Sequence, residues 1–211
     1  MLPLSVRKRI GWWNWRNGNA LLFGSAIFPA AVYPVRMPAL KNEPQVLVVS
    51  NLTFRNATLA DVDRCYAIEI EAYEGDEAAT REKIATRIAQ YPQGFICLES
   101  NGKVIGFINA GCAWDVVMSD EAFKELVGHD AAAPNVVIMS VVLDPAYQGK
   151  GYATQMMHHF TATMKQMDKQ SIHLMCKTHH VDLYKKFGYQ YIKPSDSDHG
   201  GMAWHEMLMQ L

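Results

Sequence analysis

The order of apolar patterns along the sequence predicts one mixed α/β domain. Two patterns carry this prediction. In the first half, two apolar runs flank Asn101-Gly102, a dipeptide that favours the tight turn between antiparallel strands. In the second half, the apolar run 135–145 leads through a glycine-containing turn into an amphipathic helix and then into the apolar run 171–176. At 211 residues, 49% of them hydrophobic, the chain is long enough to bury the core of one such domain.

The first half is expected to mix strands with helices. An alternating pattern after Asn51 predicts a strand that turns at residues 56–58, where Thr58 is a suitable N-cap for a helix. A second helix is expected over residues 76–91, because Ala79, Ile84 and Ile88 fall near one stripe and Pro92 and Gly94 follow. Two hairpin strands over 94–114 and a short helix over 119–128 complete this half.

The second half begins with the most apolar run of the chain. Residues 135–145 are nearly continuous in Val, Ile and Leu, which is typical of a central strand covered on both faces. A long helix is expected to follow, with Tyr152, Met156, Phe160 and Met164 as its apolar stripe. The remaining expected elements are a strand over 171–176, a helix over 179–188, and strands over 189–192 and 202–211.

Composition and charge exclude several classes of protein. Twenty basic and 21 acidic side chains give a formal net charge of -1, so no global field attracts nucleic acid or an anionic bilayer. No histidine spacing supports a metal site, and we expect none. The cysteines form no CxxC pair and are expected to be reduced structural thiols in an intracellular, cytoplasmic protein; they are Cys65, Cys97, Cys112 and Cys176. A nucleophilic Cys176, near two histidines in sequence, is the alternative.

Residues 1–50 differ from the rest and are interpreted as an extension of a domain spanning 51–211. The first acidic residue is Glu43, and the apolar run 20–34 is shorter than the roughly 20 residues of a membrane-spanning helix. Three interpretations stay open: a targeting presequence, an interfacial anchor using the tryptophans near residue 13, or a weakly ordered segment, with translation starting at Met37 as one form of the last.

The stretch "DPAYQGKGYA", residues 144–153, is the strongest functional signal. A glycine-rich turn before a helix leaves backbone N–H groups unpaired at the positive end of the helix dipole, which favours a phosphate. The spacing fits neither a P-loop nor a dinucleotide-binding turn. Gly149 and Gly151 would instead let the backbone wrap closely around a pyrophosphate.

This stretch, extended to "VVLDPAYQGKGYA", resembles the acetyl-CoA-binding motif of the GNAT N-acetyltransferase superfamily. The segment "LMCKTHHVDLYKKFGY" resembles a later part of the same family. Three further segments, "YAIEIEAYEGDEAATREKI", "QGF" and "WHEMLMQL", are most similar to the arylalkylamine N-acetyltransferase group, which includes serotonin acetyltransferases and relatives that acetylate polyamines. The resemblance covers residues 52–211. It implies a mostly antiparallel central sheet with flanking helices, acetyl-CoA as co-substrate, and direct attack by an amine in a ternary complex.

The resemblance also implies which residues hold acetyl-CoA. Backbone groups of a central strand would bind the pantetheine arm and the thioester carbonyl; these residues are Val141, Val142 and Leu143. The turn would bind the pyrophosphate through Gln148, Gly149, Lys150, Gly151, Tyr152 and Ala153. Tyr184 matches the position whose phenol protonates the departing thiolate. An ordinary exposed lysine at 150 and a core-facing tyrosine at 184 are the alternatives.

The general base is not defined by the sequence. Serotonin acetyltransferases carry two histidines where this chain has Val137 and Met139, so a histidine relay is in doubt. The candidates for the base are Glu69, Glu71, His179 and His180. Glu69, Glu71 and His179 are also the candidates for acceptor binding. An acidic set could attract a cationic amine or form a solvated helix end; its members are Glu69, Glu71, Glu74, Asp76 and Glu77.

Three functions follow from these residues. The first is acetyl-CoA-dependent N-acetylation of a small amine, an arylalkylamine or a polyamine. The second is acetylation of a protein N-terminus or lysine, which would need an open peptide groove. The third is a non-catalytic acetyl-CoA-binding module that regulates a partner. Neither a nucleic acid nor a membrane span is expected, and both a monomer and a homodimer are compatible with the sequence.

Overall fold

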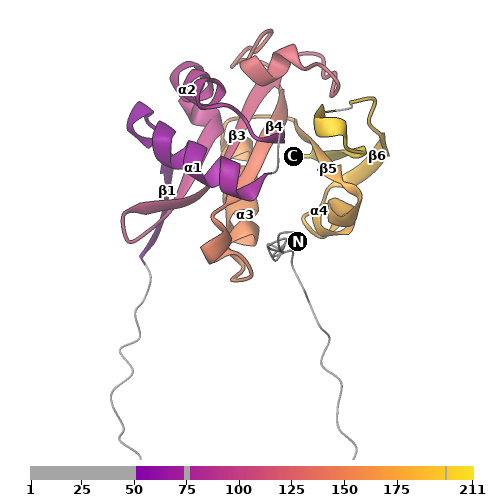
Figure 1. The fold of residues 1–211 in the computed structure, drawn as a ribbon. Helices are drawn as coiled ribbons and strands as arrows, with labels where there is room; N and C mark the ends of the chain where they lie inside the picture. The colour runs from indigo at the N-terminus through magenta and orange to yellow at the C-terminus, as the bar shows by residue number, and fades with distance from the viewer. Residues whose placement is uncertain (1–50, 74–76, 198) are drawn as a thin grey trace, which may run out of the picture. The chain divides into compact units, whose positions relative to one another are not determined.

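The structure is a computed structural model that describes residues 51–73, 77–197 and 199–211. These residues form a seven-stranded sheet in the order β1-β2-β3-β4-β5-β7-β6 (Figure 1). The strands are β1 (Leu52–Asn56), β2 (Phe95–Ser100), β3 (Lys103–Ala113), β4 (Asn135–Leu143), β5 (Ser171–Lys177), β6 (Gln190–Pro194) and β7 (Trp204–Gln210). The α-helices are α1 (Val62–Ala72), α2 (Arg81–Gln90), α3 (Tyr152–Gln166) and α4 (Val181–Lys186). The predicted mixed α/β fold is confirmed.

The two central strands, β4 and β5, separate along their length. They are the one parallel pair in the described sheet, and their pairing covers only Asn135–Val137 against Ser171–His173. On its other side β4 pairs with β3, and Met139 is an extra residue between the pairs Asn109↔Ser140 and Ala110↔Ile138. A bulge of this kind bends a strand and redirects its side chains. The second half of β4 therefore has an edge that no described strand covers.

The helices cover both faces of the sheet. On one face, Ile68 of α1 and Ile84 of α2 pack with Phe95 and Phe107. Neighbouring residues on the strands point to the opposite face, where they pack with the methionines of α3 and with Phe160. Of the apolar stripe expected for α3, Met156, Phe160 and Met164 are buried and Tyr152 is half-buried, and on the opposite face α1 packs against β4.

Several predicted boundaries move because local geometry overrides the pattern. The second helix begins at Arg81, because the Thr80 side chain accepts from the Lys83 amide at 3.3 Å and caps it there. The long helix begins at Tyr152, because residues 148–151 form a turn. The helix expected over 119–128 is a single 3-10 turn that ends where Leu126 adopts a φ of 61°. A 3-10 turn likewise replaces the start of the helix expected over 179–188.

Two further expectations concern the compartment. The four cysteines named above are free and buried. None of the helices that the structure describes is long and apolar enough to cross a bilayer. The three interpretations of residues 1–50 lie outside the described residues.

Candidate active site

The turn after β4 presents a row of free backbone donors. The N–H groups of residues 149–154 have no hydrogen-bond acceptor within the described part of the chain, and Gln155 is the first to bond, to the Gly151 carbonyl at 3.2 Å. Gly149 and Gly151 have φ values of 75° and 79°, in the region that side chains disfavour. A Cβ on either glycine would meet nothing within 4 Å, so this face of the turn is open. The free amides and the N-terminus of α3 together suit a phosphate group.

The side chains around the turn fix its shape. Asp144 accepts from the Ala146 amide at 2.9 Å and is paired with Arg64. The Gln148 side chain donates to the Leu143 carbonyl at 3.1 Å, and the Gln148 backbone N–H donates to the Pro145 carbonyl. The backbone N–H groups without an acceptor therefore begin at Gly149. The Lys150 ammonium donates to Ala146 at 3.0 Å and lies 5.2 Å from the centre of the Tyr147 ring. It therefore lies against its own turn and is exposed to solvent.

The uncovered edge of β4 leads from this turn toward a cavity. Val142 and Leu143 are buried, and the Val141 carbonyl accepts from the Tyr73 hydroxyl at 3.3 Å. Val137 and Met139, where the sequence lacks histidines, contribute apolar surface to the cavity wall. The carbonyl of Val141 thus lies beside the cavity that could receive the second substrate.

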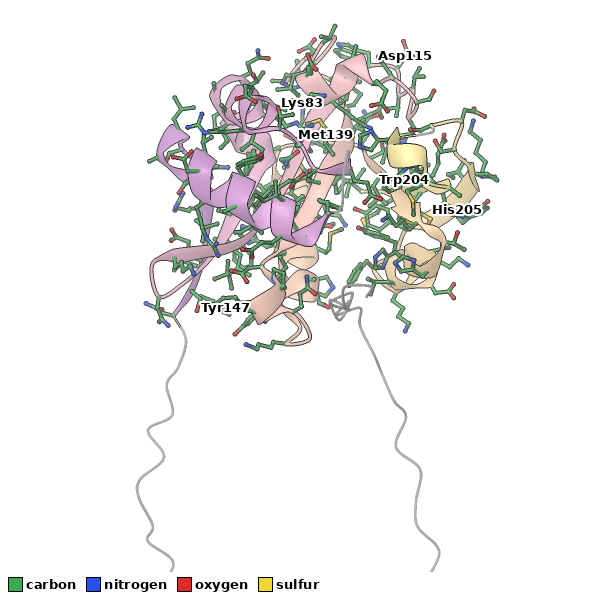
Figure 2. The ribbon with its side chains drawn as sticks, viewed as in Figure 1. Lys83, Asp115, Met139, Tyr147, Trp204 and His205 are labelled. Carbon is green, nitrogen blue, oxygen red and sulfur yellow. The ribbon has the colours of Figure 1, made fainter. Side chains whose placement is uncertain are left out.

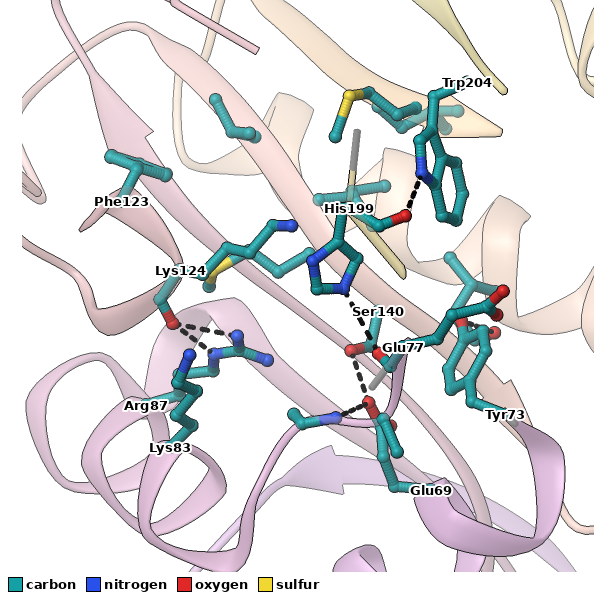
Figure 3. Close-up of a pocket in the computed structure, with 18 of the residues that line it drawn as sticks. Glu69, Tyr73, Glu77, Lys83, Arg87, Phe123, Lys124, Ser140, His199 and Trp204 are labelled. Atoms are coloured by element: carbon teal, nitrogen blue, oxygen red, sulfur yellow. Dashed lines mark hydrogen bonds between the residues drawn. The ribbon is translucent and has the colours of Figure 1, made fainter. Parts of the chain in front are cut away.

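The cavity has a volume of about 400 Å³ and is enclosed by segments far apart in sequence. Residues of α1, α2, β4, β5 and α4 line it, together with residues 117–124 and the start of β7 (Figure 3). Three of the lining residues, Lys83, Met139 and Trp204, are labelled on the whole fold in Figure 2. Its aromatic residues are Tyr66, Tyr73, Phe123, Tyr184 and Trp204. Its charged residues are Glu69, Glu77, Lys83, Arg87, Asp120 and Lys124. His199 also lines it and accepts Trp204 Nε1–H on its carbonyl at 2.8 Å.

Glu69 is a buried carboxylate on this wall, 1% exposed. Its Oε1 accepts from the Ala79 amide at 3.0 Å and from the Ser140 hydroxyl at 3.1 Å. Its Oε2 is buried and has no hydrogen-bond partner among the described residues. Burial raises the pKa of Glu69 above its usual value, against the opposing effects of the two hydrogen bonds and of Arg87. Glu69 therefore offers a free oxygen of increased basicity.

Tyr184 lines the cavity from α4. Its ring contacts Phe187 and Tyr189 edge to face, with centroids 6.2 Å and 5.6 Å away. Burial raises the pKa of the Tyr184 phenol above its usual value, so the hydroxyl keeps its proton throughout the neutral range. It is a group that can donate a proton inside the cavity.

The other candidate bases lie outside this cavity. Glu71 and His179 are exposed, and neither lines it. His180 is also absent from the lining, and burial, with smaller effects of His179 and Lys177, lowers its pKa to about 4. Glu77 lines the cavity and is paired with Lys177 at 2.7 Å. The remaining acidic candidates, Glu74 and Asp76, lie outside the described residues.

Sequence reasoning missed several lining residues, and Arg87 is the most informative. Its side chain is 3% exposed; Nε and Nη2 donate to the Lys124 carbonyl at 3.0 and 2.8 Å, and Nη1 donates to Asn109 at 3.2 Å. Burial lowers its pKa to about 10. A signal was present, because Ile84, Arg87 and Ile88 are spaced as one helical face. Ser140, Lys124 and Trp204 had no such signal.

The chain belongs to the acetyltransferase (GNAT) family, whose model matches residues 62–189. The matched residues include β4, the turn that follows it, and α4. The fold of this family agrees with the sheet observed here. The described residues contain no group of three His, Cys, Asp or Glu side chains that could hold a metal ion.

Individual relatives are distant. An uncharacterized N-acetyltransferase of Methanocaldococcus jannaschii is 23% identical over 68% of this chain, and the match spans 62% of that relative. The loading GNATL domain of CurA from Lyngbya majuscula has a TM-score of 0.67 at 14% identity, over 75% of this chain and 97% of that domain. The PaiA N-acetyltransferase of Thermoplasma acidophilum, solved with coenzyme A, has a TM-score of 0.57 at 14% identity, over 76% of this chain and 99% of that one. These likenesses establish the fold, whereas the similarity to the arylalkylamine group stays a prediction.

Proposed function

We propose that this protein is an acetyl-CoA-dependent N-acetyltransferase that acetylates the primary amine of a small acceptor. One observation carries the proposal: the uncovered edge of β4 has free turn amides at its end and a cavity with a buried carboxylate beside it. This arrangement suits two substrates meeting at the middle of the strand. Bringing them together in the right orientation is itself a large part of catalysis.

The residues present fit acetyl-CoA, which supplies the acetyl group as a thioester. The free amides of Gly149 to Thr154 would hold the pyrophosphate, with Gly149 and Gly151 giving the close approach. The backbone of Val141, Val142 and Leu143 would hold the pantetheine arm. Gln148 would act through its bond to the Leu143 carbonyl, which fixes the turn, and Tyr152 and Ala153 begin the helix whose dipole faces the phosphates.

Glu69 is the proposed proton acceptor. An alkylamine has a pKa of about 10 and is mostly protonated at neutral pH, so it must lose a proton before it can attack. The free Oε2 of Glu69 would bind the ammonium and take that proton, while the bonds to Ala79 and Ser140 hold the carboxylate in place. The raised pKa of Glu69 makes its carboxylate a stronger base, so that it differs less in basicity from the acceptor amine.

Tyr184 is the proposed proton donor to the departing sulfur. Its phenol is protonated at neutral pH and belongs to the cavity wall. A thiolate is a good leaving group, so the phenol assists the reaction and is not essential to it.

The cavity supports an arylalkylamine better than a polyamine. Tyr66, Tyr73, Phe123 and Trp204 offer aromatic surface for one aryl group. A polyamine would place further cations beside Lys83, Arg87 and Lys124, where like charges repel. A protein N-terminus or lysine side chain is the alternative acceptor.

Thiol release from acetyl-CoA tests the proposal. The acceptors are tryptamine, serotonin, phenethylamine, putrescine, spermidine, spermine and short peptides, and acetyl-CoA binding is checked by thermal shift. We expect CoA release with an aryl acceptor. A protein that binds acetyl-CoA but releases CoA only with peptides would make a protein substrate the better proposal, and one that releases none would support a binding module.

A further inference from the structure

The acceptor cavity is electrostatically divided. In Figure 3, Lys83, Arg87 and Lys124 lie together on one side, and Glu69 and Tyr73 lie toward the other. A plain amine would use the carboxylate side alone. The cationic side calls for a separate explanation, because burying positive charge is unfavourable unless something negative compensates it.

Arg87 lacks a direct carboxylate partner. Three of its five N–H groups donate to neutral oxygens of Lys124 and Asn109. The other two, one on each Nη atom, have no acceptor among the residues described. Glu69 interacts with it only through space, without a hydrogen bond. A buried guanidinium with N–H groups to spare is a donor set for a carboxylate.

The neighbouring charges do not remove this need. Lys83 is paired with Glu125 at 3.2 Å and Lys124 with Glu121 at 2.8 Å. Those two carboxylates are 58% and 51% exposed, so solvent screens both pairs. Asp120 also lines the cavity and offsets one positive charge. The lysines remain available to an anion that displaces their exposed partners.

We propose that the acceptor carries a carboxylate as well as its primary amine, and that Arg87 and Lys83 bind this carboxylate. Amino acids with an aromatic side chain have this chemistry. Glu69 Oε2 has no hydrogen-bond partner among the described residues, Arg87 keeps unused N–H groups, and both residues line one cavity, so this cavity offers an acceptor for an ammonium and donors for a carboxylate. This inference rests on the proposed function, since it names the substrate of the same cavity.

Matched acceptors test the carboxylate directly. Phenylalanine is compared with phenylalaninamide and phenethylamine, and tryptophan with tryptamine, by CoA release. We measure kcat/KM over a pH series and compare the values for the unprotonated amine of each acceptor. Differences between the pKa values of the amines then do not affect the comparison. We expect kcat/KM to be ~10- to 100-fold higher for the amino acid, the value of one or two charge-assisted hydrogen bonds.

Variants test which residues are responsible. Lys83→Met and Arg87→Gln should each remove most of the preference, measured as the ratio of kcat/KM for phenylalanine to kcat/KM for phenethylamine; the ratio is the readout because Arg87 also lowers the pKa of Glu69 and so affects both acceptors. Arg81→Met is the matched control, because Arg81 lies on the same helix, is exposed and is paired with Asp63 away from the cavity. It removes the same charge and should leave the preference intact. Lys83 is partly exposed, so its variant is expected to fold even if that of buried Arg87 does not.

The outcomes separate this inference from the proposed function. If the wild-type protein acetylates phenethylamine or tryptamine with the same kcat/KM as the amino acids, the proposal that the acceptor carries a carboxylate is wrong, and the proposed N-acetylation of a small amine still holds. If both Lys83→Met and Arg87→Gln keep the preference for the amino acid, Lys83 and Arg87 are not the residues that bind the carboxylate. Protein that binds acetyl-CoA and releases no CoA with any acceptor overturns both proposals.

Discussion

The turn proposed to bind acetyl-CoA and the cavity proposed to bind the acceptor are built in opposite ways. The turn is one continuous stretch, residues 144–154, whose glycines and helix start are local features. The cavity joins side chains more than 100 positions apart, from Tyr66 on α1 to Trp204 on β7. The first depends on backbone conformation and the second on packing. Substitutions in the turn should therefore affect acetyl-CoA binding, and substitutions in the cavity should affect the acceptor and the proton.

The largest effect is expected from Glu69→Gln. The amide keeps the shape and an oxygen for Ala79 and Ser140 but cannot take a proton, so kcat/KM should fall by ~10²- to 10³-fold. In the wild type, kcat/KM should fall as the pH drops through the raised pKa of Glu69, because protonation removes the base. The variant should lack this limb of the pH profile.

Glu71→Gln is the matched control. Glu71 lies on the same helix but is exposed and outside the cavity lining, so its loss should leave kcat/KM unchanged. Equal losses in the two variants would contradict the assignment of Glu69 and would favour a general role for the acidic surface.

Tyr184→Phe should lower kcat by ~10²-fold, because it removes one positioned proton donor. Tyr189→Phe is the comparison, since its ring lies 5.6 Å from that of Tyr184 and its buried hydroxyl has no partner among the described residues. The kcat values of both variants are measured in the steady state. If Tyr189→Phe loses as much activity, packing of the two rings and not the phenol of Tyr184 matters.

A smaller effect is expected from Gly151→Ala. A side chain at a φ of 79° costs ~1–2 kcal/mol and would displace the free amides, so KM for acetyl-CoA should rise about tenfold while the acceptor KM changes little. Gly102→Ala supplies the same strain at a φ of 76° in the turn between β2 and β3, outside residues 144–154, and a Cβ would meet open space at either glycine. If both variants raise the KM for acetyl-CoA equally, the effect is one of stability and not of the turn.

The smallest effect is expected from Asp61, which belongs neither to the turn nor to the cavity lining. Arg55 lowers the pKa of Asp61 from 3.8 to about 2, so the folded protein binds this proton less readily than the unfolded chain. The pair therefore stabilises the fold above about pH 4, and this contribution is lost as the pH falls from about 4 to 2. Asp61→Asn should lower the free energy of unfolding by ~1–2 kcal/mol at pH 7, measured by urea titration, without changing kcat/KM. A change in kcat/KM would show that global stability influences the cavity.

The sequence predicted the elements better than their ends. Stripes such as Ile84 and Ile88 identified α2, because burial of one helical face needs that spacing. The start of α2 at Arg81 was missed because it depends on one cap made by Thr80. The 3-10 turn in place of the helix at 119–128 was missed because a short apolar pattern does not specify which hydrogen bonds close it.

The candidate site divides in the same manner. Gly149, Gly151 and Tyr184 could be proposed from the sequence because they belong to short continuous patterns. Among four candidate bases, only Glu69 lines the cavity, and nothing local distinguishes it from Glu71 two residues later. Which of the two is buried follows from how α1 lies against β4.

By itself, the sequence determined the mixed α/β fold, the acetyltransferase family and the position of the glycine-containing turn before α3. Periodicity and glycine-dependent backbone conformation act over a few residues, so a linear pattern records them. Only the tertiary structure decided that Glu69 has a free buried oxygen, that Arg87 has unused N–H groups, and that both line one cavity. Burial and missing hydrogen-bond partners depend on every segment that packs around a side chain, and these come from the whole length of the domain.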